Sequence, residues 1–305
     1  MEEKFEKLKE NLRNVLSKDR LMFDELMSAH TSFKIGGPCD VLALPKEEKE
    51  FVEIIKIVKA LSFPYYVMGN GSNILVSDKG IRGLVIKTDK MDKCDVLDDS
   101  LEAGAGILLS KLSNIALENS LTGLEFASGI PGTLGGAIYM NAGAYDGEIS
   151  KVLESTIFST SDGVLKKIDL AQHEFGYRQS VFHKNGGFIL KSRLKLKKGN
   201  KDEILEKMKD FTSRRTTKQP LEMPSAGSTF KRPEGYFAGK LIMDAGLSGR
   251  RVGGAVVSQK HCGFVVNDGG ATANDVLQLV EMIKREVKQK FDVELNPEIK
   301  FVGEK

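Results

Sequence analysis

The sequence has few cysteines, and none of them forms a close pair. Cys39, Cys94 and Cys262 are the three cysteines among 305 residues. Disulfide frameworks and zinc knuckles require cysteines in close or regularly spaced pairs. The spacing excludes both, so we expect a protein of the reducing cytoplasm that binds no metal.

A large excess of one charge is also missing. Lys and Arg number 45 and Asp and Glu number 42, which leaves a formal net charge of +3. Binding to a nucleic-acid backbone generally requires a stronger positive field. We therefore expect no nucleic-acid partner, and no feature predicts an obligatory protein partner.

Long apolar runs are missing too, and we expect no membrane-spanning segment, because such a helix needs about 20 consecutive apolar residues. The opening segment, MEEKFEKLKENLRNVL, lacks the apolar core and small-residue cleavage site of a secretion signal. Its Phe5, Leu8, Leu12 and Val15 share one helical face. They predict an amphipathic helix packed on the body of the protein.

The composition is typical of a globular protein with more than one domain. Hydrophobic residues make up 41% and charged residues 29% of a chain that is longer than one compact core usually organises. Apolar runs on either side of a helical stretch predict a βαβ unit over residues 33–87. Short alternating segments over residues 155–196 predict an antiparallel sheet, with the cations of LKSRLKLKK on its wet face. The fold class is therefore α+β.

A third α/β unit is predicted over residues 199–305. It starts with helical patterning, and a long helix from about Thr272 to Lys290 precedes a closing strand at residues 299–302. Thr272 and Asp275 have the spacing of a capping box. The predicted buried stripe of the helix consists of Val276, Val280, Ile283 and Val287.

Two glycine-rich segments carry the main chemical signal. GNGSN, at Gly69–Asn73, follows the apolar run YYVM, and its small residues tolerate the positive φ with which successive N–H groups surround an anion. It has neither the ending of a P-loop nor the helix that follows a Rossmann turn. A tight hairpin turn explains the same residues equally well.

The second segment, SGIPGTLGGAIYMNAG, spans Ser128–Gly143. Its glycines leave room for a ligand close to the backbone, and Thr133 is a candidate cap for a short helix. Close packing of a glycine-rich helix on a sheet is the alternative. Two such segments in one chain favour a flat ligand that carries an anionic group.

These segments belong to a series of blocks by which the chain resembles the UDP-N-acetylenolpyruvoylglucosamine reductases (MurB), in the shorter form of that family. The blocks are HTSFKIGGPCD, GNGSN, GLEFASGIPGTLGGAIYMNAGAY, GYRQS, AGSTFKRP and NPEIKFVG. The resemblance implies a PCMH-type FAD-binding domain over residues 33–198, with subdomains at about 33–90 and 91–198. It also implies a helical segment before this domain, at residues 1–32, and a substrate-binding domain after it, at residues 199–305.

The resemblance implies non-covalent FAD, with NADPH as the cosubstrate. GNGSN would hold the pyrophosphate, and the second segment would line the flavin. The implied cofactor-binding residues are Gly69, Asn70, Gly71, Ser72, Asn73, Ser128, Gly129, Ile130, Gly132, Thr133, Gly135, Gly136, Asn141 and Gly143.

The same resemblance implies the activity of a UDP-N-acetylmuramate dehydrogenase, which reduces the enolpyruvyl group of a UDP-sugar in peptidoglycan precursor synthesis. Arg178, Ser228 and Glu298 would be catalytic, and Tyr177 and Lys218 would bind substrate. Taken singly, Arg178, Ser228 and Glu298 would more often be a surface cation, a turn hydroxyl and an exposed carboxylate. Their motifs favour the catalytic interpretation.

The chemistry suits these side chains. Hydride addition to the methylene carbon creates an enolate-like carboxylate, which Arg178 can bind through two hydrogen bonds. Ser228 can donate the proton to the neighbouring carbon, and Glu298 would assist as the neutral acid.

A field of cations surrounds Lys218 in the sequence and suits a polyanionic substrate. The cations outweigh the nearby acids Glu222, Glu234 and Asp244. They are Arg214, Arg215, Lys218, Lys231, Arg232, Lys240, Arg250 and Arg251.

Two other functions remain open. Related PCMH-type proteins are FAD oxidases of alcohols or sugars, which often tether the flavin to His or Cys. No histidine lies in either glycine-rich segment, whereas Cys39 is nearby in the sequence. A nonredox nucleotide-binding module is the second alternative.

Overall fold

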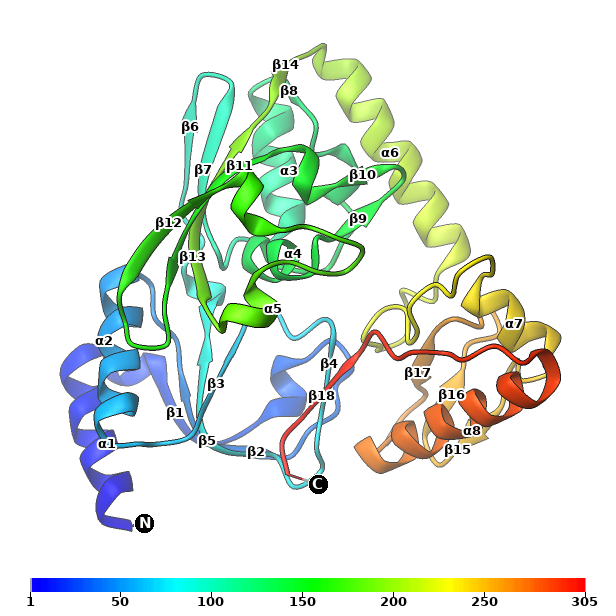
Figure 1. The fold of residues 1–305 in the computed structure, drawn as a ribbon, viewed down its shortest axis with the longest axis horizontal. Coiled ribbons are helices and arrows are strands. Elements are labelled where there is room, and N and C mark those ends of the chain that lie inside the picture. Colours follow the sequence, from blue (N-terminus) through cyan, green and yellow to red (C-terminus); the bar gives the residue numbers. More distant parts are fainter. Residues whose placement is uncertain (1, 305) are drawn as a thin grey trace. The chain divides into compact units, whose positions relative to one another are not determined.

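The computed structural model describes residues 2–304 (Figure 1). The chain folds into two compact units. Unit 1 contains the chain up to Phe23, Val41–Asn70 and Gly83–Arg214. Unit 2 contains Asp24–Asp40, Gly71–Arg82 and the chain from Arg215 on. The units interleave in the sequence, and the domain boundaries expected near residues 33 and 199 remain predictions.

The first core of unit 1 combines two helices with a four-stranded sheet, three of whose strands extend into segments assigned to unit 2. The strand order is β1 (Leu21–Leu26), β2 (Pro38–Ala43), β5 (Ile81–Lys87) and β3 (Tyr65–Met68). The helices are α1 (Glu2–Val15) and α2 (Glu48–Ala60). The predicted helix at the start of the chain is confirmed, with Leu8 and Leu12 fully buried. The predicted strand–helix–strand order is also confirmed, but β5 lies between β2 and β3.

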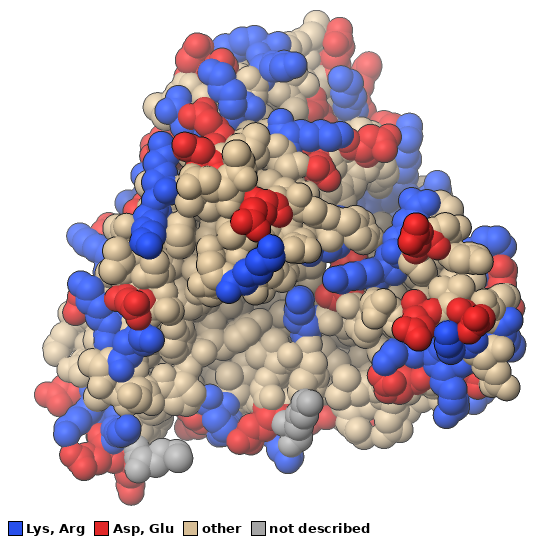
Figure 2. All heavy atoms as spheres, in the orientation of Figure 1, with Lys and Arg blue, Asp and Glu red and all other residues tan. Residues whose placement is uncertain are grey.

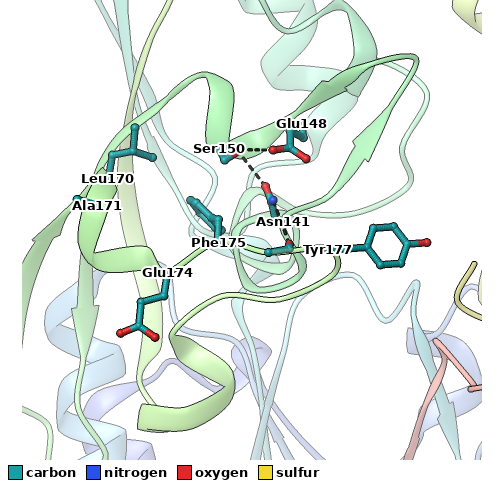
Figure 3. A pocket seen from close by; sticks show the side chains of 9 residues that line it. Asn141, Glu148, Ser150, Leu170, Ala171, Glu174, Phe175 and Tyr177 are labelled. Carbon is teal, nitrogen blue, oxygen red and sulfur yellow. Dashed lines mark hydrogen bonds between the residues drawn. The ribbon is translucent and has the colours of Figure 1, made fainter. Parts of the chain in front are cut away.

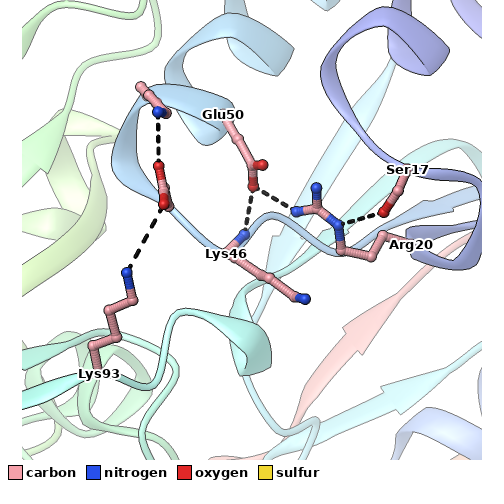
Figure 4. Close-up of polar contacts among 7 residues, drawn as sticks. Ser17, Arg20, Lys46, Glu50 and Lys93 are labelled. Atoms are coloured by element: carbon pink, nitrogen blue, oxygen red, sulfur yellow. Dashed lines mark hydrogen bonds and ion pairs between the residues drawn. The ribbon is translucent and has the colours of Figure 1, made fainter.

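A largely buried ion pair holds the start of α2 (Figure 4). Arg20 Nη1 lies 2.7 Å from Glu50 Oε2, and the backbone N–H of Lys46 donates to the same oxygen over 2.8 Å. Burial raises the pKa of Glu50, but the hydrogen bonds from Arg20 and Lys46 outweigh it and leave the pKa below its ordinary value.

The second core of unit 1 belongs to an antiparallel five-stranded sheet. Its order is β12 (Leu165–Asp169), β11 (Leu153–Ser159), β13 (Phe188–Lys195), β7 (Ser100–Gly104) and β6 (Cys94–Leu97). In β13 the Leu190 and Leu194 side chains are buried, whereas Lys191 and Lys195 are 32% and 55% exposed. The antiparallel sheet and its wet face of cations are confirmed.

Shorter elements complete unit 1. The helices α3 (Leu109–Glu118) and α4 (Leu134–Met140) contribute buried residues to the second core, and α5 (Phe182–Asn185) follows the Tyr-Arg block. The hairpin strands β9 (Gly143–Ala144) and β10 (Gly147–Glu148) follow α4. β14 (Lys197–Lys198) pairs with β8 (Leu121–Thr122), and α6 (Lys201–Lys218) continues into unit 2.

Unit 2 has a small antiparallel sheet covered by a long helix. The sheet order is β15 (Arg251–Val252), β16 (Ala255–Val257) and β17 (Val265–Asn267). The helices of the unit are α7 (Ala238–Asp244) and α8 (Ala273–Phe291). A second, two-stranded sheet forms where β4 (Ile74–Val76) pairs in parallel with β18 (Lys300–Val302). The predicted capping box of Thr272 and Asp275 is confirmed. All four residues of the predicted α8 stripe are buried.

Short 3₁₀ helices connect the longer elements at Lys18–Arg20, Met27–His30, Thr88–Lys90, Glu125–Ala127, Ile149–Lys151 and Leu170–His173. Over residues 2–304, no helix combines the length and the apolar character that are needed to span a bilayer.

Candidate functional site

The two glycine-rich segments meet in unit 1. The side-chain amide of Asn70 donates a hydrogen bond to the carbonyl oxygen of Pro131 over 2.7 Å. A Cβ atom at Gly69 would stand 2.3 Å from Thr133 Oγ1, well inside van der Waals contact. Gly69 therefore has to lack a side chain for the two segments to approach.

The hairpin interpretation of GNGSN is wrong. The strand before the segment, β3, pairs with β5, and the strand after it, β4, pairs with β18. The segment therefore connects two different sheets. Within the segment, Gly71 alone adopts a positive φ, of 66°. The sequence predicted positive φ at several successive residues, but only this one residue adopts it.

Thr133 occupies the N-cap position of α4, but its hydroxyl makes no capping hydrogen bond. The residue is 1% exposed, and Thr133 Oγ1 has no hydrogen-bond partner among the described residues. An unsatisfied buried hydroxyl costs roughly 1–3 kcal/mol. This orphaned group fits a ligand such as FAD, which would supply the missing partner.

Some glycines of the second segment are required by packing instead. A Cβ at Gly135 would lie 2.9 Å from the Cβ of Ala105, and one at Gly143 would lie 2.7 Å from the carbonyl oxygen of Gly147. At Gly136 the nearest atom would be 3.6 Å away, which is ordinary contact. Helix packing and an open backbone face therefore occur in the same segment.

The Tyr-Arg block forms a tight turn with Tyr177 and Arg178 at its centre. The N–H of Gly176 donates to the carbonyl of Gln179 over 3.1 Å, and the N–H of Gln179 donates to the carbonyl of Gly176 over 3.2 Å. Arg178 has a φ of 55°, which is uncommon for a residue other than glycine and signals strain. Arg178 Cζ lies 5.0 Å from the centre of the Tyr177 ring, and Tyr177 is 57% exposed.

A cavity of about 580 Å³ adjoins this turn (Figure 3). Its lining combines carboxylates, amide and hydroxyl groups with the Phe175 and Tyr177 rings. The lining residues are Asn141, Glu148, Ser150, Leu170, Ala171, Glu174, Phe175, Gly176 and Tyr177.

Ser228 and Glu298 lie on paired segments of unit 2. The N–H of Glu298 donates to the carbonyl of Thr229, the residue after Ser228, over 2.9 Å. The N–H of Lys231 donates to the carbonyl of Asn296 over 2.9 Å. Ser228 is exposed and Glu298 is partly exposed, so both side chains are accessible to a ligand.

Lys218 is the exposed last residue of α6. Several cations predicted to form a field around it have acidic partners within 3 Å: Arg214 pairs with Asp210 and Lys240 with Asp244, both over 2.8 Å. Arg251 pairs with Asp268. In the face drawn in Figure 2, Lys and Arg are interspersed with Asp and Glu. The cation field is therefore weaker than the sequence count predicts.

The Cys39 thiol is unsuited to a covalent flavin link. The residue is fully buried, and burial raises the pKa of its thiol to about 11. A reactive cysteine needs an accessible thiolate.

Comparison with known proteins places these features in a family. Residues 219–302 match the UDP-N-acetylenolpyruvoylglucosamine reductase, C-terminal domain, and residues 39–169 match the FAD binding domain family. The second match spans both glycine-rich segments and confirms FAD as the cofactor. The α+β class, with a PCMH-type FAD-binding fold and a C-terminal domain, is confirmed as well.

Individual relatives match almost from end to end. The chain is 52% identical over 294 residues to the UDP-N-acetylenolpyruvoylglucosamine reductase of Alkaliphilus oremlandii, covering 96% of this chain and 97% of the relative. It is 50% identical over 294 residues to that of Clostridium tetani, covering 96% of both. A crystal structure of the Thermus caldophilus reductase (MurB) superposes with a TM-score of 0.79 at 37% identity, covering 91% of this chain and 97% of that one.

These matches confirm the oxidoreductase activity that the sequence blocks imply. The chain belongs to the UDP-N-acetylenolpyruvoylglucosamine reductase family.

Proposed function

We propose that this protein reduces UDP-N-acetylglucosamine enolpyruvate to UDP-N-acetylmuramate in the cytoplasm, with NADPH as the electron donor. Bound FAD would supply the hydride-transfer chemistry that links NADPH to the methylene carbon of the enolpyruvyl group. Arg178, Ser228 and Glu298 are the proposed catalytic residues, and Tyr177 and Lys218 bind the substrate.

The observation that carries this assignment is the pairing of the Ser228 and Glu298 segments through Thr229. It brings a hydroxyl and a carboxyl group onto neighbouring segments of one unit. Ser228 donates its hydroxyl proton to the carbon beside the substrate carboxylate, and Glu298 as the neutral acid donates a hydrogen bond to the developing charge. Arg178 binds the same carboxylate through its guanidinium group.

FAD contacts are proposed for the backbone of both glycine-rich segments, with Thr133 Oγ1 as a donor to the cofactor. Its orphaned, buried state supports this contact.

The test separates the two half-reactions. Anaerobic NADPH should bleach the flavin of the purified protein, and the enolpyruvyl UDP-sugar should restore the oxidised spectrum. Ser228→Ala should slow the restoration by about a hundredfold while bleaching stays close to wild type, since general acid catalysis contributes about that much. Ser248→Ala, at an exposed serine of the same unit, is the matched control.

Equal losses in both half-reactions would remove Ser228 from the proton-donor role. Restoration of the oxidised spectrum by oxygen and not by the enolpyruvyl sugar would favour the oxidase alternative. A flavin that NADPH does not bleach would favour the nonredox module.

A further inference from the structure

Asn141 connects the glycine-rich segment to the Tyr-Arg turn. It caps the C-terminus of α4 with a left-handed φ of 43° and is 3% exposed. Its Nδ2 donates to the carbonyl oxygen of Gly176 over 3.2 Å, and its Oδ1 accepts from the N–H of Ser150 over 3.1 Å (Figure 3). Both polar atoms of the side chain are therefore engaged inside the protein.

A second buried side chain holds the other end of the turn. Ser180 is 1% exposed, and its hydroxyl donates to the carbonyl of Tyr139 over 2.8 Å. The N–H of Ser180 donates to His183 Nδ1, whose ring lies 4.0 Å from that of Tyr139. Residues 176–180 are thus attached at both ends to the last turn of α4.

The attachment matters because the turn is strained at Arg178. The carbonyl of Gly176 accepts both the turn hydrogen bond from Gln179 and the Asn141 amide. Asn141 therefore acts on the peptide group that sets the direction of the turn. A guanidinium that binds a carboxylate through two hydrogen bonds tolerates little misorientation.

We infer that Asn141 is a positioning residue for Arg178: its amide holds the strained Tyr-Arg turn against the end of the glycine-rich segment. The inference rests on the proposed function, in which Arg178 binds the substrate carboxylate. It replaces the FAD contact expected for Asn141 with a role that is exerted through the turn.

The decisive variant is Asn141→Asp. Aspartate keeps the size, the tolerance of positive φ and the acceptor for Ser150, but it places an acceptor against the Gly176 carbonyl. Reoxidation of the flavin by the enolpyruvyl sugar should slow about tenfold or more, because small misplacements of a catalytic group are that costly. Bleaching by NADPH and the dissociation constant of FAD should stay within twofold of wild type.

Asn119→Asp is the matched control. Asn119 also caps a helix C-terminus, that of α3, and its Nδ2 also donates to a backbone carbonyl, that of Ile115, over 2.8 Å. The variant introduces the same charge at an exposed helix C-cap outside the turn, where Asn119 has a φ of −98°. It should leave both half-reactions at the wild-type rate.

A double-mutant cycle tests whether Asn141 acts through Arg178. In an Arg178→Ala background, Asn141→Asp should change the reoxidation rate less than twofold. A full additional loss in that background, or a loss of FAD affinity in Asn141→Asp alone, would overturn the inference. If Asn141→Asp folds poorly, Ser180→Ala takes its place in the same cycle. A Ser180→Ala effect on reoxidation that persists in the Arg178→Ala background would likewise contradict the inference.

Failure of the proposed function gives a different pattern. If the wild-type flavin is not reoxidised by the enolpyruvyl sugar, or if Arg178→Ala reoxidises at the wild-type rate, the catalytic assignment is wrong and the positioning role falls with it. If Arg178→Ala is slow and Asn141→Asp is not, only the positioning role is wrong.

Discussion

The backbone N–H of Glu298 lies 2.9 Å from the carbonyl oxygen of Thr229 and donates a hydrogen bond to it. This contact joins segments that are far apart in the sequence, one next to Ser228 and one carrying Glu298. It is a backbone contact, so substitution of either side chain should leave the pairing intact. Kinetic effects of such variants can then be assigned to the side chains.

Glu298 allows a comparison between two substitutions. Because the proposal requires a neutral donor at this position, Glu298→Gln should keep more of the reoxidation rate than Glu298→Ala, by about tenfold. Stopped-flow reoxidation with the enolpyruvyl sugar measures both. If Gln is as slow as Ala, hydrogen-bond donation by a neutral acid is not the role of Glu298.

Thr133→Val should separate stability from cofactor binding. Without FAD the variant loses no hydrogen bond within the described part of the protein and removes an unsatisfied buried hydroxyl, so its free energy of unfolding should stay equal or rise by about 1 kcal/mol. With FAD the affinity should fall about tenfold, the value of one hydrogen bond. Urea unfolding of the FAD-free protein and fluorescence titration with FAD give the two numbers.

Thr156→Val is the control for Thr133→Val. Thr156 is equally buried, but its hydroxyl lies 3.0 Å from Ser192 Oγ and 2.8 Å from His173 Nε2. Its loss should lower the free energy of unfolding by about 1–3 kcal/mol. Equal stability changes in the two variants would show that the Thr133 hydroxyl is satisfied in the FAD-free protein.

His173 predicts a loss of stability in acid. Its ring is fully buried between Phe175 and Phe182, and burial lowers its pKa from the ordinary value of 6.5. Below pH 6.5 the unfolded chain therefore binds a proton at His173 more readily than the folded protein does. The contribution of neutral His173 to the free energy of unfolding is fully present above this pH and is lost as the pH falls below it.

Urea unfolding of the holoprotein at a series of pH values measures this effect. His173→Gln should be less stable at neutral pH and should show a shallower decline in acid than the wild type. The decline should not vanish, because burial also lowers the pKa of His261. Parallel curves for the two proteins would contradict the assignment to His173.

Asp78 should contribute to the stability of unit 2. Its carboxylate accepts hydrogen bonds from the N–H groups of Ala273 and Asn274 over 2.7 and 3.1 Å, at the N-terminus of α8. Asp78→Ala should lower the free energy of unfolding by about 1–2 kcal/mol, as for loss of an N-terminal cap. Asp98→Ala, at an exposed aspartate outside any helix N-terminus, serves as the control, and an equal effect in the two variants would exclude the capping role.

The sequence alone was sufficient to predict features that depend on neighbouring residues. The period of Val276, Val280, Ile283 and Val287 predicted the buried face of α8, and the spacing of Thr272 and Asp275 predicted its start. Such patterns are readable because the side chains of one helix turn interact along the chain. The family blocks likewise predicted the cofactor and the activity, because each block is a short run of defined residues that can be recognised in the sequence.

Only the tertiary structure decided which distant segments meet and which groups remain unsatisfied. No local pattern shows that Asn70 contacts Pro131, that β4 pairs with β18 and so excludes a hairpin, or that Asp268 pairs with Arg251 of the cation field. The orphaned hydroxyl of Thr133 and the amide bridge from Asn141 to Gly176 belong to this class. Burial and hydrogen-bond satisfaction depend on everything packed around a group, so they are properties of the fold and not of the residue.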